Sequence, residues 1–185
     1  MNLEVREEPI TALADYAQVS GAFLVSRVLE LTVRGGGIPG FVLAERAVDV
    51  PWPKDYDAIP QNGPAHWAHR FDVSSWALFA ARADGRRIGG AVVTSDTPAL
   101  LWDIRVSPEA RGRGVGSALF RHAKSWAAAR GCRQLAIETQ NINVPACRFY
   151  ERQGCELGAV HRFAYPELPR EVQLIWYADL SSDAS

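Results

Sequence analysis

Three short apolar runs follow one another in the middle of the chain, and a tight turn separates each run from the next. The turns fall at Asp84–Gly85 and at Asp96–Pro98, where residue types that favour turns interrupt the apolar pattern. Short apolar runs joined in this way are typical of neighbouring antiparallel strands. The pattern therefore predicts an antiparallel meander over residues 76–83, 86–94 and 100–106.

The apolar positions then change to a helical period, three or four residues apart along one face. This face consists of Val115, Ala118, Leu119, Ala123, Trp126 and Ala127. The helix is expected to span residues 115–130, to end at Gly131, and to be followed by a strand over residues 134–138. A strand, a helix and a second parallel strand in this order predict a right-handed βαβ unit. A short helix over residues 144–153 should come next, because Asn143 is a good N-cap.

The first third of the chain predicts a short helix and then a hairpin. Residues 11–20 favour the helix. Apolar residues alternate in part over residues 23–33, glycine and proline gather over residues 34–40, and an apolar run returns over residues 41–50. The two apolar runs are predicted to pair as antiparallel strands. The segment 51–72, which mixes prolines and glycines with aromatic and acidic residues, is predicted to be a long loop.

Composition limits the range of architectures and partners. A chain of 185 residues with 48% hydrophobic content has the size and core of one domain, residues 1–185. Its predicted class is α/β, with a mixed central sheet in which the antiparallel meander leads into the βαβ unit, flanked by helices. The net charge of −1 provides no overall attraction to nucleic acid or to an anionic membrane. We therefore expect a small-molecule partner, no nucleic acid and no membrane.

The cysteines and histidines give no sign of a metal centre. Cys132, Cys147 and Cys155 form an odd set without metal-ligand spacing, which argues against a disulfide framework or a structural zinc. His66 and His69 lie three residues apart without a third ligand nearby. The N-terminus carries acidic residues where a signal peptide needs basic and apolar ones, and no run reaches the roughly 18 apolar residues of a membrane span. The sequence thus predicts a cytoplasmic protein without a metal.

A glycine-rich turn stands between the predicted strand 100–106 and the long helix. It reads Arg-Gly-Arg-Gly-Val-Gly from Arg111 to Gly116. The start of a helix exposes unpaired backbone N–H groups and the positive end of the helix dipole, and glycines let a phosphate approach them. A diphosphate is the expected ligand. The spacing is not that of a Walker loop, because no lysine precedes Ser117, and G-x-G-x-G matches the dinucleotide fingerprint only weakly.

Two longer stretches make the interpretation more specific. The pattern R-x-x-G-x-G, formed by Arg111, Gly114 and Gly116, resembles the acetyl coenzyme A signature of the GNAT N-acetyltransferases. The string ETQNINVPACRFYERQG and the string PWPKDYD resemble the corresponding segments of streptothricin acetyltransferases. The resemblance implies a GNAT fold, acetyl coenzyme A as co-substrate, and acetylation of an amino group in the β-lysine portion of the antibiotic.

The resemblance also implies roles for individual residues. Backbone groups of Ile104, Arg105 and Val106 would hold the pantetheine arm of the coenzyme. The pyrophosphate would lie in the glycine-rich turn, formed by Arg111, Gly112, Arg113, Gly114, Val115, Gly116 and Ser117. Asn143 would contact the arm, and Tyr150 would contact the coenzyme and act as general acid. Tyr150 could instead be a core aromatic residue whose hydroxyl meets a backbone carbonyl.

Acetylation of an amine requires a base. A lysine-like amine has a pKa of about 10.4, so only roughly one molecule in a thousand is neutral at pH 7. Asp103 and Glu138 are the candidate carboxylates. On a regular strand Asp103 shares its face with Arg105 and lies opposite Trp102. Asp103 could instead be the ion-pair partner of Arg105 or Arg111.

The substrate is expected near the segment 51–72, where acidic residues can pair with a cation and aromatic faces can make cation–π contacts. Trp52, Tyr56 and Trp102 are the candidate substrate-binding residues, although the tryptophans of an exposed loop could simply pack on the domain. Related enzymes commonly have a glutamate at the position of Trp102.

Three functions stay open from the sequence: an N-acetyltransferase of a small amine, a peptide or protein N-acetyltransferase, and a non-catalytic acyl-CoA sensor. The sequence also does not decide between a monomer and a homodimer.

Overall fold

A computed structural model describes residues 2–35 and 40–181. The chain divides into two compact units. The first unit comprises Met1–Ala22, Asp55–Ala136 and Ala178–Ser185, and the second comprises Phe23–Lys54 and Ile137–Tyr177. The strands form a mixed, mostly antiparallel arrangement with helices beside it, so the predicted α/β class is confirmed.

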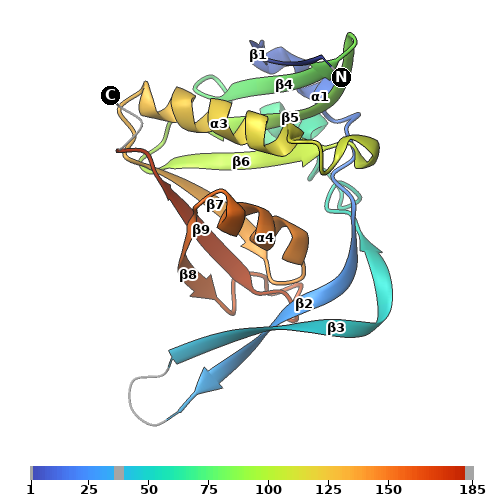
Figure 1. The fold of residues 1–185 in the computed structure, drawn as a ribbon, viewed down its shortest axis with the longest axis vertical. Helices are drawn as coiled ribbons and strands as arrows, with labels where there is room; N and C mark the ends of the chain where they lie inside the picture. Colours follow the sequence, from blue (N-terminus) through green and yellow to red (C-terminus); the bar gives the residue numbers. More distant parts are fainter. Residues whose placement is uncertain (1, 36–39, 182–185) are drawn as a thin grey trace. The chain divides into compact units, whose positions relative to one another are not determined.

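Four neighbouring antiparallel strands form the sheet of the first unit (Figure 1). In spatial order they are β1 (Leu3–Glu8), β4 (Ala77–Ala83), β5 (Arg86–Thr94) and β6 (Ala99–Val106). The predicted meander is confirmed as β4, β5 and β6. Asp84 and Gly85 join β4 to β5 with positive φ angles of 50° and 79°, as a two-residue hairpin turn requires. Strand β1 was not expected from the sequence, because its alternation is short and mostly charged.

Helix α3 (Val115–Ala128) packs on this sheet. Its apolar stripe is buried as the periodicity predicted. Gly89 on β5 makes the close approach possible, because a Cβ there would lie 3.3 Å from the Leu119 side chain and 2.8 Å from the Arg105 carbonyl oxygen. The helix stops two residues before the predicted end, and Gly131, at a φ of +78°, donates its N–H to Ala128 O in the turn that follows.

The predicted helix over residues 11–20 is shorter than expected: a 3₁₀ turn, η1 (Ile10–Ala12), runs into α1 (Leu13–Tyr16). The predicted loop is also more ordered than expected. It contains a 3₁₀ turn, η2 (Pro64–His66), and the helix α2 (Trp67–Arg70). Both short helices fold because apolar side chains from α1, α2, β4 and β5 share one buried cluster, which consists of Leu13, Tyr16, Trp67, Leu78 and Val92.

The second unit contains the hairpin of β2 (Phe23–Arg34) and β3 (Gly40–Lys54), a long ribbon in Figure 1. The predicted strands are confirmed, and most of the predicted turn lies outside the described residues. Strand β3 is longer than predicted, because Trp52 and Pro53 pair with Val25 and Leu24. Residues 51–54 are therefore strand and not loop, which corrects the expectation for the start of the segment 51–72.

The rest of the second unit is built around strands β7 (Gln134–Gln140), β9 (Gln173–Asp179) and β8 (Glu156–His161), in that spatial order. Strand β7 begins in the first unit and β9 ends there. Helix α4 (Val144–Arg152) follows β7, and the Asn143 side chain accepts a hydrogen bond from Ala146 N at 3.2 Å, so the predicted N-cap is confirmed. Within the described residues, no helix is both long enough and apolar enough to cross a membrane.

Candidate functional site

The glycine-rich turn has the backbone shape that an anion site needs. Gly112 and Gly114 have φ angles of 73° and 81°, a region that residues with a Cβ rarely adopt. Apart from the adjoining residues of the turn, no heavy atom in the described part of the chain lies within 4 Å of the position that a Cβ would take at either glycine. Gly114 is the N-cap of α3, and a glycine has no side chain with which to cap the helix start. The turn therefore presents an open backbone surface at the positive end of a 14-residue helix.

Arg111 holds this turn against the end of β6. Its Nε donates to the Val106 carbonyl oxygen at 2.9 Å, and its Nη2 donates to the Ala22 carbonyl oxygen at 3.0 Å. Two of the N–H groups of Arg111 thus donate to backbone carbonyl oxygens. The side chain anchors the turn in addition to the phosphate-binding role that the sequence predicts for it.

Strand β6 departs from regular pairing at Trp102. Leu101 pairs with Val93 and Asp103 pairs with Val92, so Trp102 is an extra residue that opposes no partner on β5. The bulge breaks the alternation of side chains along the strand. As a result Trp102 and Asp103 line one pocket, although a regular strand would place them on opposite faces.

Asp103 is held by two donors on one of its oxygens. The Tyr16 hydroxyl donates to Asp103 Oδ2 at 2.8 Å, and Arg105 Nε donates to the same oxygen at 2.7 Å. Burial raises the pKa of Asp103 above its ordinary value, and the Arg105 charge and the Tyr16 hydrogen bond offset part of this rise. Burial, with the nearby Asp103 charge, also raises the pKa of Tyr16 well above its ordinary value, so Tyr16 remains a proton donor in the hydrogen bond.

Arg105 joins Asp103 to the segment that follows β3. Its Nη1 donates to Asp57 Oδ2 at 2.6 Å and to the Val19 carbonyl oxygen at 3.1 Å. Burial alone would lower the pKa of this guanidinium, but the charges of Asp103 and Asp57 hold the pKa above its ordinary value. The sequence left open whether Asp103 pairs with Arg105 or Arg111, and the structure shows Arg105.

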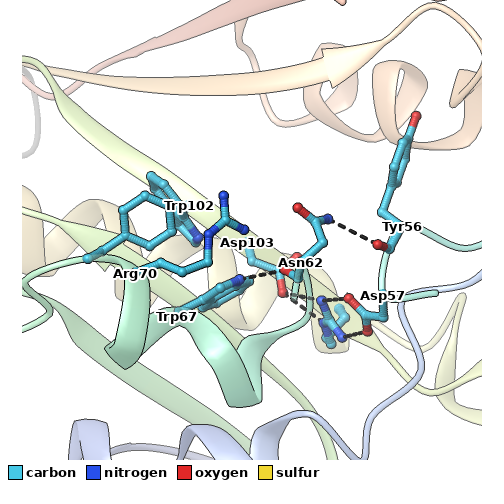
Figure 2. A pocket seen from close by; sticks show the side chains of 9 residues that line it. Tyr56, Asp57, Asn62, Trp67, Arg70, Trp102 and Asp103 are labelled. Carbon is cyan, nitrogen blue, oxygen red and sulfur yellow. Dashed lines mark hydrogen bonds and ion pairs between the residues drawn. The ribbon is translucent and has the colours of Figure 1, made fainter. Parts of the chain in front are cut away.

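These residues belong to a pocket of about 210 Å³ in the first unit. Its lining consists of Tyr56, Asp57, Asn62, Trp67, Arg70, Phe71, Trp102, Asp103 and Arg105. Figure 2 shows Trp67 and Trp102 grouped on one side, away from Asp57 and Tyr56. The rings of Trp67 and Phe71 meet Trp102 edge-on, with centroids 6.0 and 4.9 Å away. The pocket thus combines carboxylates with aromatic walls.

The predicted substrate-binding residues are divided between the two units. Tyr56 and Trp102 line this pocket. Trp52 lies on β3 of the second unit, opposite Val25, and 39% of its surface is exposed.

Tyr150, Asn143 and Glu138 lie in the second unit. Tyr150 is a buried residue of α4, with 4% of its surface exposed and its ring 5.1 Å from that of Phe149. Glu138 is exposed and accepts hydrogen bonds from the Tyr165 hydroxyl at 2.5 Å and from Gln173 Nε2 at 2.7 Å. Burial, together with this hydrogen bond to Glu138, raises the pKa of Tyr165.

Sequence reasoning missed several residues that line the pocket, and it missed Tyr16, which donates a hydrogen bond to Asp103 from outside this lining. Asp57 and Trp67 belong to the acidic and aromatic segment that the sequence singled out, but Tyr16 and Arg70 carried no signal of their own. Tyr16 looks like an ordinary apolar position of a short helix, and Arg70 looks like a solvated cation. The available signal was the pair Gly89 and Gly90 on β5, next to the strand that carries Trp102 and Asp103, because adjacent glycines in a strand indicate that another group packs closely there.

Comparison with known proteins gives consistent matches. The Acetyltransferase (GNAT) family matches residues 43–155. A streptothricin acetyltransferase of Streptomyces lavendulae is 34% identical over 139 residues, which cover 74% of this chain and 72% of that protein. A streptothricin acetyltransferase of Escherichia coli is 31% identical over 170 residues, which cover 89% and 90%. A Bacillus anthracis crystal structure in complex with acetyl coenzyme A has a TM-score of 0.77 at 26% identity, covering 96% of this chain and 99% of that one.

Proposed function

Because the chain belongs to the acetyltransferase (GNAT) family, we propose that it transfers the acetyl group of acetyl coenzyme A to a primary amine of a small cationic molecule. A streptothricin-like antibiotic is the leading substrate, since two relatives of 31% and 34% identity carry that activity in their names. Family membership makes the chain an N-acetyltransferase with acetyl coenzyme A as co-substrate, and the predicted GNAT fold is confirmed. The pocket supports a cationic amine as substrate, because partly buried carboxylates and aromatic rings line it together.

The glycine-rich turn fits the coenzyme. The open space at Gly112 and Gly114 and the glycine N-cap of α3 suit a pyrophosphate. The residues that would hold it are Arg111, Gly112, Arg113, Gly114, Val115, Gly116 and Ser117. The backbone of Ile104, Arg105 and Val106 would hold the pantetheine arm, with Asn143 as a further contact. The coenzyme supplies the acetyl group as a thioester.

Asp103, in the first unit, is the proposed acceptor of the proton that the substrate amine loses. A carboxylate whose pKa is raised by burial is a better proton acceptor than an ordinary surface aspartate. Its Oδ2 is occupied by Tyr16 and Arg105, which fix the orientation of the carboxylate. Glu138 in the second unit is the other candidate base, oriented by Tyr165 and Gln173.

Tyr150 is the proposed general acid, which protonates the departing thiolate. Direct transfer to the amine needs no covalent enzyme intermediate. The chemistry of Cys147 agrees with this: burial raises the pKa of its thiol, which lies 3.5 Å from the Thr139 hydroxyl. A thiol with a raised pKa forms little thiolate at neutral pH and is a poor nucleophile.

Consumption of acetyl coenzyme A tests the proposal across streptothricin, polyamines, aminoglycosides and short peptides. We expect the highest kcat/KM with streptothricin and a product with one added acetyl group by mass spectrometry. A preference for peptides would favour a peptide N-acetyltransferase. Binding of acetyl coenzyme A without turnover of any amine would favour a sensor and contradict the proposal.

A further inference from the structure

Two polar groups in the pocket keep unused hydrogen-bonding capacity. Asp103 uses only Oδ2 for Tyr16 and Arg105, and within the described part of the chain its Oδ1 has no hydrogen-bond partner. This oxygen can accept a hydrogen bond from a ligand. The acid that the sequence singled out therefore keeps one acceptor for a substrate amine.

Arg70 is the second group, and it differs from Arg105 in its partners. Its Nη1 donates to the Gln61 carbonyl oxygen at 3.0 Å, and its guanidinium carbon lies 5.1 Å from the centre of the Phe71 ring. Among residues 2–35 and 40–181, no carboxylate pairs with Arg70, whereas Arg105 pairs with both Asp57 and Asp103. A guanidinium has five N–H donors, so Arg70 can still bind an acceptor.

The pocket therefore offers an acceptor at Asp103 and donors at Arg70, with the rings of Trp67, Phe71 and Trp102 among its other lining groups. A plain polyamine would satisfy Asp103 but would bring a second positive charge toward Arg70. An amine that carries a carbonyl oxygen would satisfy both groups, and the guanidinium would then form a charge-assisted hydrogen bond.

We propose that this pocket selects amines that carry a carbonyl oxygen, as an amide or as a carboxylate, and that Arg70 is the specificity-determining residue that binds this oxygen. The inference rests on the proposed function and defines the substrate class of the same pocket. Asp103 and Asp57 balance the charges of Arg105 and Arg70, so both the amide and the carboxylate fit the charge of the pocket. Aminoacyl amides and diamino acids are thus expected substrates in addition to the antibiotic.

Three compounds with the same five-carbon diamine skeleton test this proposal: lysinamide, lysine and cadaverine. They differ only in a carboxamide, a carboxylate or a hydrogen on one carbon. We expect the parent enzyme to acetylate lysinamide or lysine with a kcat/KM at least tenfold above that for cadaverine, since a charge-assisted hydrogen bond is worth about a tenfold change or more. The better of the two carbonyl compounds identifies whether amide or carboxylate is preferred.

Arg70→Gln should reduce that preference about tenfold or more, and it should raise the KM for streptothricin more than it lowers kcat. Arg130→Gln is the matched control, because Arg130 also donates to a backbone carbonyl and lies over an aromatic ring, two residues beyond the C-terminal end of α3. It should leave the preference and the KM for streptothricin unchanged.

The proposal is overturned if the parent acetylates streptothricin while Arg70→Gln keeps both the parent's KM and its preference among the three compounds. Equal use of cadaverine and the carbonyl compounds by the parent also overturns it. A parent enzyme that acetylates no amine at all would instead contradict the proposed function, so the two failures can be told apart.

Discussion

The hydrogen bond between Tyr16 and Asp103 should set the pH range in which the enzyme works. Tyr16 is fully buried, and its hydroxyl donates to Asp103 Oδ2 at 2.8 Å. This bond lowers the pKa of Asp103, against the larger effect of burial, which raises it. In Tyr16→Phe the ionised carboxylate loses the donor, so its pKa should rise further.

The size of the effect follows from the charge on the acceptor. A hydrogen bond to a charged group contributes about 1.5 to 3 kcal/mol, and about 1.36 kcal/mol corresponds to one pKa unit. The acid limb of kcat/KM should therefore move upward by about one to two pH units if ionised Asp103 accepts the substrate amine. The free energy of unfolding of Tyr16→Phe should be about 1.5 to 3 kcal/mol lower than that of the parent, which corresponds to a Tm lower by roughly 3 to 12 °C for a chain of this size.

The dependence of stability on pH gives a second measurement. The native pKa of Asp103 lies above its unfolded value, so this group favours folding most at low pH, and its contribution declines as the pH rises through the native value. Tyr16→Phe removes a donor to the ionised form. Its Tm deficit relative to the parent should therefore be larger above the native pKa of Asp103 than below the ordinary aspartate value.

The assay is acetyl coenzyme A consumption with streptothricin at a series of pH values, accompanied by thermal unfolding at the same values. Tyr177→Phe is the control, because Tyr177 lies on β9 against Gly158 and outside the Tyr16–Asp103–Arg105–Asp57 network. An acid limb that coincides in Tyr16→Phe and the parent would refute the role of ionised Asp103. A Tm deficit independent of pH would show that the tyrosine acts only through packing.

Three further outcomes are expected. Gly114→Ala should weaken acetyl coenzyme A binding, measured by calorimetry, at least tenfold. The control Gly131→Ala, beyond the other end of α3 with a similar φ, should cost about 1 to 2 kcal/mol of stability and leave this affinity unchanged. Equal effects of the two variants on binding would contradict the pyrophosphate site. Tyr150→Phe should lower kcat more than it changes KM in steady-state kinetics, and parent-like kinetics would remove the general-acid role. Gly90→Ala should destabilise the fold by about 1 to 3 kcal/mol in denaturant unfolding, because its Cβ would lie 2.7 Å from the Tyr16 ring; an unchanged midpoint would mean that the ring can shift freely.

Much of the fold could be predicted because local patterns decide it. The meander, the helix beginning at Val115 and the N-cap at Asn143 depend on residue types within a few positions of one another. The hairpin of β2 and β3 was predicted for the same reason. The end of β3 was not, because Trp52 lies between two prolines, which argue against a strand, and the pairing with Val25 on a distant segment decides its conformation.

The candidate site could be predicted only where a single segment forms it. The glycine-rich turn is contiguous, so its composition reveals both the tight backbone and the helix start. The pocket takes Asp57, Arg70 and Asp103 from three segments of the chain, and Tyr16 from a fourth segment donates to Asp103. No local pattern connects these residues. The expectation that Asp103 and Trp102 lie on opposite faces of the strand was wrong. The bulge that brings them to one pocket depends on the register with β5 and not on the residues of β6 alone.

Strand β5 explains why the hydrogen bond from Tyr16 to Asp103 and the bulge at Trp102 occur at the same place. At Gly90 a Cβ would lie 2.7 Å from the Tyr16 ring and 2.7 Å from the Phe79 carbonyl oxygen, so only glycine leaves room for the tyrosine to lie over the strand and reach Asp103. Two residues later the register slips between Val92 and Val93, which frees Trp102 from pairing. The space left by Gly90 thus lets the Tyr16 hydroxyl reach the Asp103 carboxylate, and the register shift on the same strand lets Trp102 line the pocket together with Asp103. The chemistry of β6 is therefore determined largely by the packing requirements of its neighbour, and substitutions on β5 should alter the pocket without contacting any substrate.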